Sequence, residues 1–217
     1  MNKYRRILIM TSVEAERDAI LRGIGTDSRI DVRLAGVGPI SAGIQTARAL
    51  TADEYDLVIN MGIAGGFTDK ADVGSLVIAN EIVSADLGAE SPEGFITLDE
   101  LGFGASTRVK TDSDLVQILL EVIKAANISV QAGNILTLST VTGTAETTAK
   151  LQQREPGALA EAMEGYGVGM AAKDFGLPVL EVRSISNPIG PRDRSAWRIK
   201  DALVTLESAS KVIAEVL

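Results

Sequence analysis

The chain has 217 residues, which suits one domain with a single core, and we expect residues 1–217 to form one such unit. Its net charge of -8 disfavours nucleic acid and anionic membranes as partners, since both are negatively charged. The sequence has no Cys and no His, which excludes a thiol nucleophile and a Ser-His-Asp triad and disfavours a zinc site. Any catalysis must therefore use carboxylates, amides, hydroxyls, Lys, Arg or backbone groups.

The first ten residues are basic and then apolar, a pattern that superficially resembles an export signal. The apolar run ends at Thr11, however, and the acidic Glu14 and Glu16 follow. We interpret residues 5–10 as a first strand and expect a cytoplasmic protein. No apolar run approaches the roughly 20 residues that a membrane span requires.

Strand-like and helix-like patterns then alternate along the chain. In chain order they predict strand 5–10, helix 13–22, strand 31–35, helix 41–50, strands 56–61 and 75–84, helix 113–126, strand 130–137, helices 144–153 and 165–175, strand 178–185 and helix 196–216. This alternation is typical of an α/β fold, here a three-layer α/β/α sandwich around a central mixed, largely parallel sheet. The Gly-rich residues 86–106 are expected to form an irregular surface excursion.

Ligands of such sheets bind beyond the carboxyl ends of the strands. The segments that follow the predicted strands there are 11–16, 36–39, 62–66, 140–144 and 186–193. The segment GVGPISAG does not fit a dinucleotide-binding motif, because Ser41 stands where the third Gly belongs. Two interpretations of the Gly-rich segments stay open: ordinary tight turns, or turns that bring backbone N–H groups near a ligand.

Five motifs in this order resemble the nucleoside phosphorylase/nucleosidase superfamily. They are VEAER at 13–17, GVGP at 36–39, NMGIAGG at 60–66, AMEGYGVGMAA at 162–172 and VRSISNPIG at 182–190. The resemblance covers nearly the whole chain, and its closing part is most similar to the futalosine hydrolase family. It implies a purine nucleoside phosphorylase-like fold and hydrolysis of the N-glycosidic bond of futalosine with release of hypoxanthine in a route to menaquinone. It also implies no metal, no cofactor and a homodimer or higher homo-oligomer.

The resemblance also implies roles for single residues. Glu16 would activate the attacking water, Met163 and Glu164 would hold the ribose, and Asn187 stands where adenine-specific nucleosidases have Asp. Further residues are expected to line the substrate site: Ala64, Gly65, Thr140, Val141 and Thr142.

Chemistry supports the same residues. Cleavage of an N-riboside passes through an oxocarbenium-like transition state, which one carboxylate stabilises while another deprotonates water. For a 6-oxopurine, the side-chain NH₂ of Asn187 can donate to both N7 and O6. An adenine-type base would leave partners unsatisfied there, at a cost of roughly 1–3 kcal/mol.

Some alternatives stay open. No Arg lies in 60–67, so water is favoured over phosphate as the nucleophile, although Arg17 could reach an anion. Arg192 is either solvated or recognises a carboxylate on the 5′ tail of the substrate. Trp197 is expected in the core. Rival functions are a nucleosidase or phosphorylase for inosine-like or methylthioadenosine-type substrates, or a non-catalytic nucleoside-binding protein.

Overall fold

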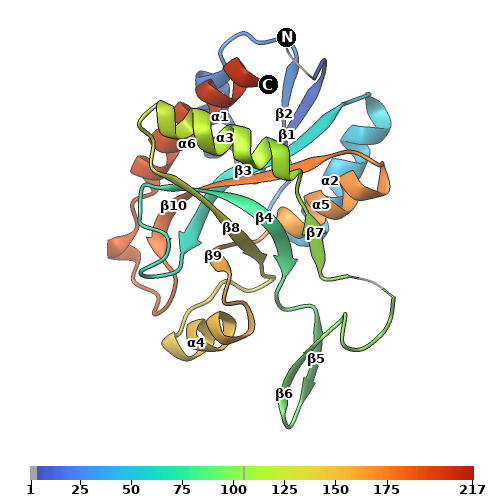
Figure 1. Ribbon diagram of the computed structural model, residues 1–217, viewed down its shortest axis with the longest axis vertical. Coiled ribbons are helices and arrows are strands. Elements are labelled where there is room, and N and C mark those ends of the chain that lie inside the picture. The colour runs from blue at the N-terminus through green and yellow to red at the C-terminus, as the bar shows by residue number, and fades with distance from the viewer. Residues whose placement is uncertain (1–3, 105) are drawn as a thin grey trace.

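The computed structural model describes residues 4–104 and 106–217 (Figure 1). Its strands are β1 (Ile7–Thr11), β2 (Ile30–Leu34), β3 (Leu57–Gly66), β4 (Leu76–Ser84), β5 (Gly88–Ser91), β6 (Gly94–Thr97), β7 (Arg108–Lys110), β8 (Val130–Thr137), β9 (Ala158–Ala162) and β10 (Val179–Pro188). Its helices are α1 (Glu14–Ile24), α2 (Pro39–Ala52), α3 (Ser113–Ala125), α4 (Ala145–Arg154), α5 (Gly165–Asp174) and α6 (Ile199–Val216), with a 3-10 turn at Arg194–Ala196.

Within the described residues, eight strands form one mixed sheet. β2, β1, β3 and β10 run parallel to one another, whereas β4, β8 and β9 run the opposite way. Because β10 pairs with both β3 and β4, the five strands β3, β9, β8, β4 and β10 close into a ring. The expected three-layer arrangement around a mixed sheet is confirmed, and part of that sheet is curled into a barrel.

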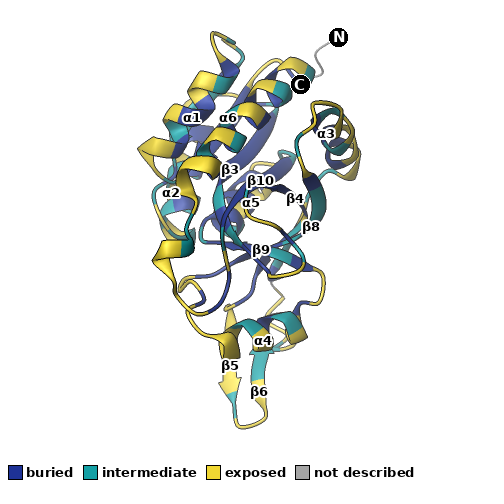
Figure 2. Cartoon of the chain, turned by 90° about the vertical axis from the view of Figure 1, so that its left-hand side faces the viewer, coloured by how far each residue is buried: buried dark blue, intermediate teal, exposed yellow. Residues whose placement is uncertain are grey.

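Helices cover both faces of the sheet, because side chains alternate along each buried strand. On β1, Ile7 and Ile9 join the core cluster that contains residues of α1, α3 and α6. The intervening Leu8 and Met10 join the cluster under α2 and α5. In Figure 2 the central strands are accordingly buried, while the outer faces of the helices are exposed.

The glycines of GYGVG bring α5 into close contact with α2. A Cβ on Gly167 would lie 2.0 Å from the carbonyl oxygen of Pro39 and 2.9 Å from the backbone nitrogen of Gly43. Only glycine permits such an approach of two helix backbones. The contact fixes the start of α5, and thereby the position of Glu164 immediately before it.

Several predicted boundaries are wrong. Residues 62–66 and 186–188, predicted as turns, continue β3 and β10, because the two segments pair with each other up to Gly66 and Pro188. The strand β9 was not predicted, since Glu161 interrupts a five-residue apolar run. In the predicted excursion, whose residue 105 lies outside the described residues, β5 and β6 form a hairpin that projects from the sheet (Figure 1).

Candidate active site

A cavity of about 400 Å³ opens where the carboxyl ends of β1, β3, β9 and β10 converge. The ends of β3 and β9 meet head-on, because these antiparallel strands overlap only at Gly65–Glu161 and Gly66–Ala160. All predicted site residues but one line this cavity: Glu16, Ala64, Gly65, Val141, Thr142, Met163, Glu164, Asn187 and Arg192. The exception is Thr140, which is exposed and outside the lining.

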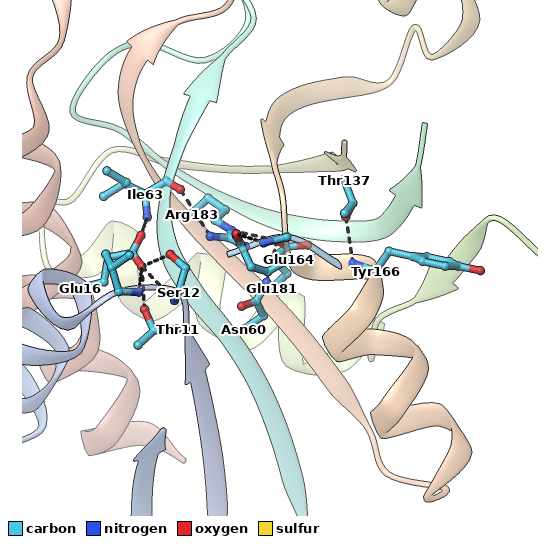
Figure 3. Close-up of polar contacts among 12 residues, drawn as sticks. Thr11, Ser12, Glu16, Asn60, Ile63, Thr137, Glu164, Tyr166, Glu181 and Arg183 are labelled. Atoms are coloured by element: carbon cyan, nitrogen blue, oxygen red, sulfur yellow. Dashed lines mark hydrogen bonds and ion pairs between the residues drawn. The ribbon is translucent and has the colours of Figure 1, made fainter. Parts of the chain in front are cut away.

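Glu16 is only 2% exposed, and its buried carboxylate accepts hydrogen bonds from five donors (Figure 3). Its Oε1 accepts from the backbone N–H of Ile63 at 2.8 Å. Its Oε2 accepts from the hydroxyl of Thr11 at 3.0 Å, from the N–H and hydroxyl of Ser12 at 3.0 and 2.5 Å, and from the N–H of Val13 at 3.2 Å. Glu16 is the third residue of α1, so it also caps the helix N-terminus. The orientation of the carboxylate is therefore fixed.

The Glu164 carboxylate is buried and paired. Its Oε1 accepts from the backbone N–H of Gly38 at 3.2 Å, and its Oε2 lies 3.1 Å from Nη2 of Arg183. The GVGP segment thus directs an N–H group to a side chain of the cavity. The cost of burying a carboxylate is offset by these two charge-assisted hydrogen bonds.

Arg183, on β10, was missed by sequence reasoning and links the carboxylates of the site (Figure 3). Its Nε donates to Glu181 at 2.8 Å, and its Nη1 donates to the carbonyl oxygen of Ile63 at 3.4 Å. Burial acts to lower the pKa of Arg183, but the charges of Glu181, Glu164 and Glu16 outweigh it and raise that pKa. Arg183 therefore stays a cation in the core of the site.

Gly62 allows Arg183 and Glu16 to approach each other. A Cβ at this position would lie 2.6 Å from Nη1 of Arg183 and 2.6 Å from Oε1 of Glu16. Any larger residue would displace one of the two groups. This packing gives a physical reason for a glycine directly after Met61.

Glu181 is the buried partner behind Arg183, outside the cavity lining. Burial raises the pKa of Glu181, although the charge of Arg183 and a hydrogen bond from Asn60 at 3.0 Å oppose this. Its second oxygen has no hydrogen-bond partner. The sequence did indicate that Glu181 and Arg183 could pair, because they are two residues apart on a strand and so share one face.

Asn187 lines the cavity near the end of β10. Its Nδ2 donates to the carbonyl oxygen of Pro188 at 3.0 Å, and its Oδ1 accepts from the hydroxyl of Ser186 at 2.8 Å. The amide oxygen is thus occupied by a donor and one N–H of the NH₂ group by an acceptor. A second N–H remains to offer, and the first becomes available if the contact with Pro188 is released.

Arg192 and Trp197 form the rim of the cavity. The guanidinium carbon of Arg192 lies 5.0 Å from the centroid of the Trp197 ring, a cation–π distance. The expectation that Trp197 is a core residue is wrong, because it lines the cavity. Arg17, a candidate anion ligand, instead pairs with Asp18 at 3.1 Å and is not in the lining.

Residues 4–104 and 106–217 contain neither a candidate metal site nor a candidate membrane span. No group of three or more His, Cys, Asp or Glu side chains there could hold a metal ion. None of the helices described has the length and apolarity needed to cross a membrane.

The chain matches the family model of the phosphorylase superfamily over residues 14–217. It is 48% identical to a futalosine hydrolase of Streptomyces coelicolor, over 97% of this chain and 96% of that one. Among solved structures it resembles a futalosine hydrolase of Helicobacter pylori, with a TM-score of 0.85 and 20% identity over 97% of each chain. It equally resembles a 5′-methylthioadenosine/S-adenosylhomocysteine nucleosidase of Neisseria meningitidis, with a TM-score of 0.85 and 17% identity over 98% of this chain and 100% of that one.

The two structural matches agree on the fold and do not separate the substrates. The sequence identity to the Streptomyces futalosine hydrolase is much higher than to either solved structure, and that match spans both chains almost completely. The chain therefore belongs to the phosphorylase superfamily and, within it, to the futalosine hydrolase family.

Proposed function

We propose that this chain hydrolyses the N-glycosidic bond of futalosine and releases hypoxanthine, a step in the futalosine route of menaquinone biosynthesis. The observation that carries the proposal is one cavity lined by Glu16, Glu164 and Asn187, in a chain 48% identical to a futalosine hydrolase. These are the two carboxylates and the neutral donor that hydrolysis of a 6-oxopurine riboside needs.

In the proposed reaction Glu16 takes a proton from water as the water oxygen bonds to C1′. The bond between C1′ and N9 breaks, and its electron pair goes to the purine. Glu164 accepts hydrogen bonds from the ribose hydroxyls and stabilises the cationic sugar, while Met163 packs against the ring. The Asn187 amide releases the carbonyl of Pro188 and donates hydrogen bonds to N7 and O6, which stabilises the negative charge on the leaving base. The base then takes up a proton from water, and Glu16 returns its own proton to water.

Water is favoured over phosphate by the charges around the cavity. Arg183 is the buried cation next to Glu16, but its Nε and Nη2 already donate to Glu181 and Glu164, and it lies outside the cavity lining. A phosphate at that point would meet two carboxylates, Glu16 and Glu164, and the only cation among the described residues of the lining is Arg192, which stacks on Trp197 at the rim. The same pair of carboxylates argues against a protein that merely binds nucleosides.

The 5′ tail of the substrate would extend toward Arg192 and Trp197. Futalosine carries a benzoate in this tail, and we propose that Arg192 binds that carboxylate while Trp197 contacts the aromatic ring. Arg192 is exposed, so this contact would contribute to substrate binding more than to bond cleavage.

We further propose that residues 1–217 act as one catalytic domain in a cytoplasmic homodimer. An apolar surface beside the cavity supports the dimer. Val37, just before α2, is 58% exposed, and Ile40 and Ile44, near the start of α2, are 79% and 54% exposed. Light scattering should give a dimer for the wild-type protein and a monomer for Ile40→Glu. A wild-type monomer would refute this part, and recovery in the membrane fraction of lysed cells would refute the localisation.

One experiment tests the proposed reaction. The protein is incubated with futalosine, inosine and methylthioadenosine, with and without phosphate, and the products are identified by mass spectrometry. We expect hypoxanthine and the free sugar from futalosine whether or not phosphate is present. A sugar phosphate as the product, or cleavage of methylthioadenosine in preference to futalosine, would refute the proposal.

A further inference from the structure

Glu161 is a buried carboxylate in the cavity that has no role in the reaction proposed above. It is 5% exposed, stands on β9 and lines the cavity together with Asn187. Its Oε1 accepts from the backbone N–H of Thr142 at 2.9 Å, and its Oε2 accepts from the hydroxyl of Thr142 at 2.5 Å. Both oxygens retain a lone pair, since each carboxylate oxygen can accept two hydrogen bonds.

The sheet places Glu161 and Asn187 on either side of one glycine. Gly65 on β3 is the direct partner of Glu161 on β9 and also of Asn187 on β10. A Cβ on Gly65 would lie 3.4 Å from Nδ2 of Asn187 and 3.6 Å from Cγ of Glu161. An amide donor and a carboxylate acceptor thus flank the same side-chain-free position in the cavity.

This pair matches the edge of a 6-oxopurine. Along that edge N7 and O6 are acceptors, and N1–H, next to O6, is a donor. If the Asn187 amide donates to N7 and O6, the N1–H needs an acceptor on the side away from Asn187. An adenine-type base has an acceptor at N1, which would face the carboxylate without a hydrogen bond.

We propose that Glu161 accepts the N1–H of the purine and is a specificity-determining residue for 6-oxopurines, acting with Asn187 across Gly65. The inference deepens the proposed function and rests on it for the position of the base. Burial raises the pKa of Glu161 against the effect of the two Thr142 hydrogen bonds, which marks a desolvated carboxyl. A third donor from the base would favour its charged form. The competing explanation is a purely structural one, in which Glu161 only anchors the loop at Thr142.

The substitution Glu161→Gln separates the two explanations. In the variant, the amide oxygen of the Gln side chain can still accept from the backbone N–H of Thr142. The hydroxyl of Thr142, which donates to Glu161 in the wild type, can instead accept from the new NH₂ group. The loop anchor is therefore retained, but a donor replaces one acceptor. The matched control is Glu155→Gln, which changes another buried carboxylate that pairs with Arg108 outside the cavity.

Two quantities are measured for wild type and both variants: kcat/KM for futalosine against its 6-amino counterpart, and Kd for hypoxanthine against adenine. We expect Glu161→Gln to lower the preference for the 6-oxo compound about 10- to 100-fold in both ratios, and Glu155→Gln to leave both unchanged. Unchanged ratios in Glu161→Gln would overturn the inference.

The base-binding ratio does not require catalysis, so it is informative even if the proposed function fails. Failure of the wild-type protein to cleave futalosine would refute that function, whereas wild-type-like ratios in an active Glu161→Gln would refute only the role of Glu161. If the variant does not fold, a crystal structure of the wild-type protein with hypoxanthine decides. A carboxylate oxygen of Glu161 within about 3.2 Å of N1 supports the inference, and a separation beyond about 4 Å overturns it.

Discussion

The guanidinium of Arg183 lies 3.1 Å from the carboxylate of Glu164, and neither side chain is more than 5% exposed. Arg183 stands on β10 and Glu164 just before α5, so the ion pair joins two segments of the site that are far apart in the sequence. A buried pair of this kind is costly to break from one side, because the remaining charge loses its partner.

The first prediction is that Arg183→Met destabilises the protein and disables it. Glu164 would be left as a buried carboxylate with only the Gly38 N–H to bind it, which should cost about 3–5 kcal/mol in the free energy of unfolding. Urea unfolding and futalosine kinetics check this. Wild-type stability together with a wild-type rate would show that the pair matters for neither.

The second prediction concerns the water-activating base. Glu16→Gln should lower kcat about 10²- to 10⁴-fold, because an amide cannot take the proton from water. Hypoxanthine binding should change little, since the amide is not proposed to contact the base. The control is Glu14→Gln, an exposed residue on the same helix. Full hydrolysis by Glu16→Gln would show that another group is the base.

The third prediction concerns pH and Glu181. Since its pKa is raised in the folded state, the folded protein holds a proton that the unfolded chain releases as the pH rises from the ordinary pKa of 4.5. The contribution of Glu181 to folding stability should therefore fall as the pH rises above 4.5. Glu181→Gln lacks this titration, faces the same Arg183, Glu164 and Asn60, and should gain stability relative to wild type as the pH rises. A constant difference between the urea midpoints of wild type and Glu181→Gln at every pH would contradict the prediction.

The fourth prediction separates substrate binding from chemistry at the rim. Arg192→Ala should raise KM for futalosine roughly 5- to 20-fold by removing a charge-assisted hydrogen bond to the 5′ carboxylate. It should leave kcat, and both constants for inosine, near wild type, because inosine has no such carboxylate. An unchanged KM for futalosine would leave Arg192 as a solvated residue.

Much of the site could be predicted from the sequence, because its motifs follow strand ends in a fixed order. Glu16 follows β1, Gly65 lies near the end of β3 and Asn187 near the end of β10, so parallel strands bring all three to one edge. Met163 and Glu164 were found through the family resemblance and reach the same edge from β9, which runs the opposite way.

Arg183 and Glu161 could not be assigned in the same way. A lone Arg or Glu in an apolar strand gives no information about its partners, because those partners come from other strands. Glu161 meets Thr142 through the pairing of β9 with β8, and Arg183 meets Glu164 because β9 and β10 both pair with β3. The spacing of Glu181 and Arg183 was the one local signal of a buried ion pair.

The fifth prediction bears on the central claim, that a neutral amide meets the purine edge as the glycosidic bond breaks. The decisive measurement is kcat/KM for futalosine and for its 6-amino counterpart, with the wild-type protein and with Asn187→Asp. The wild type should prefer the 6-oxo substrate by about tenfold or more, and Asn187→Asp should shift the ratio toward the 6-amino substrate by a similar factor. A wild-type protein that cleaves both equally well, or an Asn187→Asp variant with the wild-type ratio, would contradict the account.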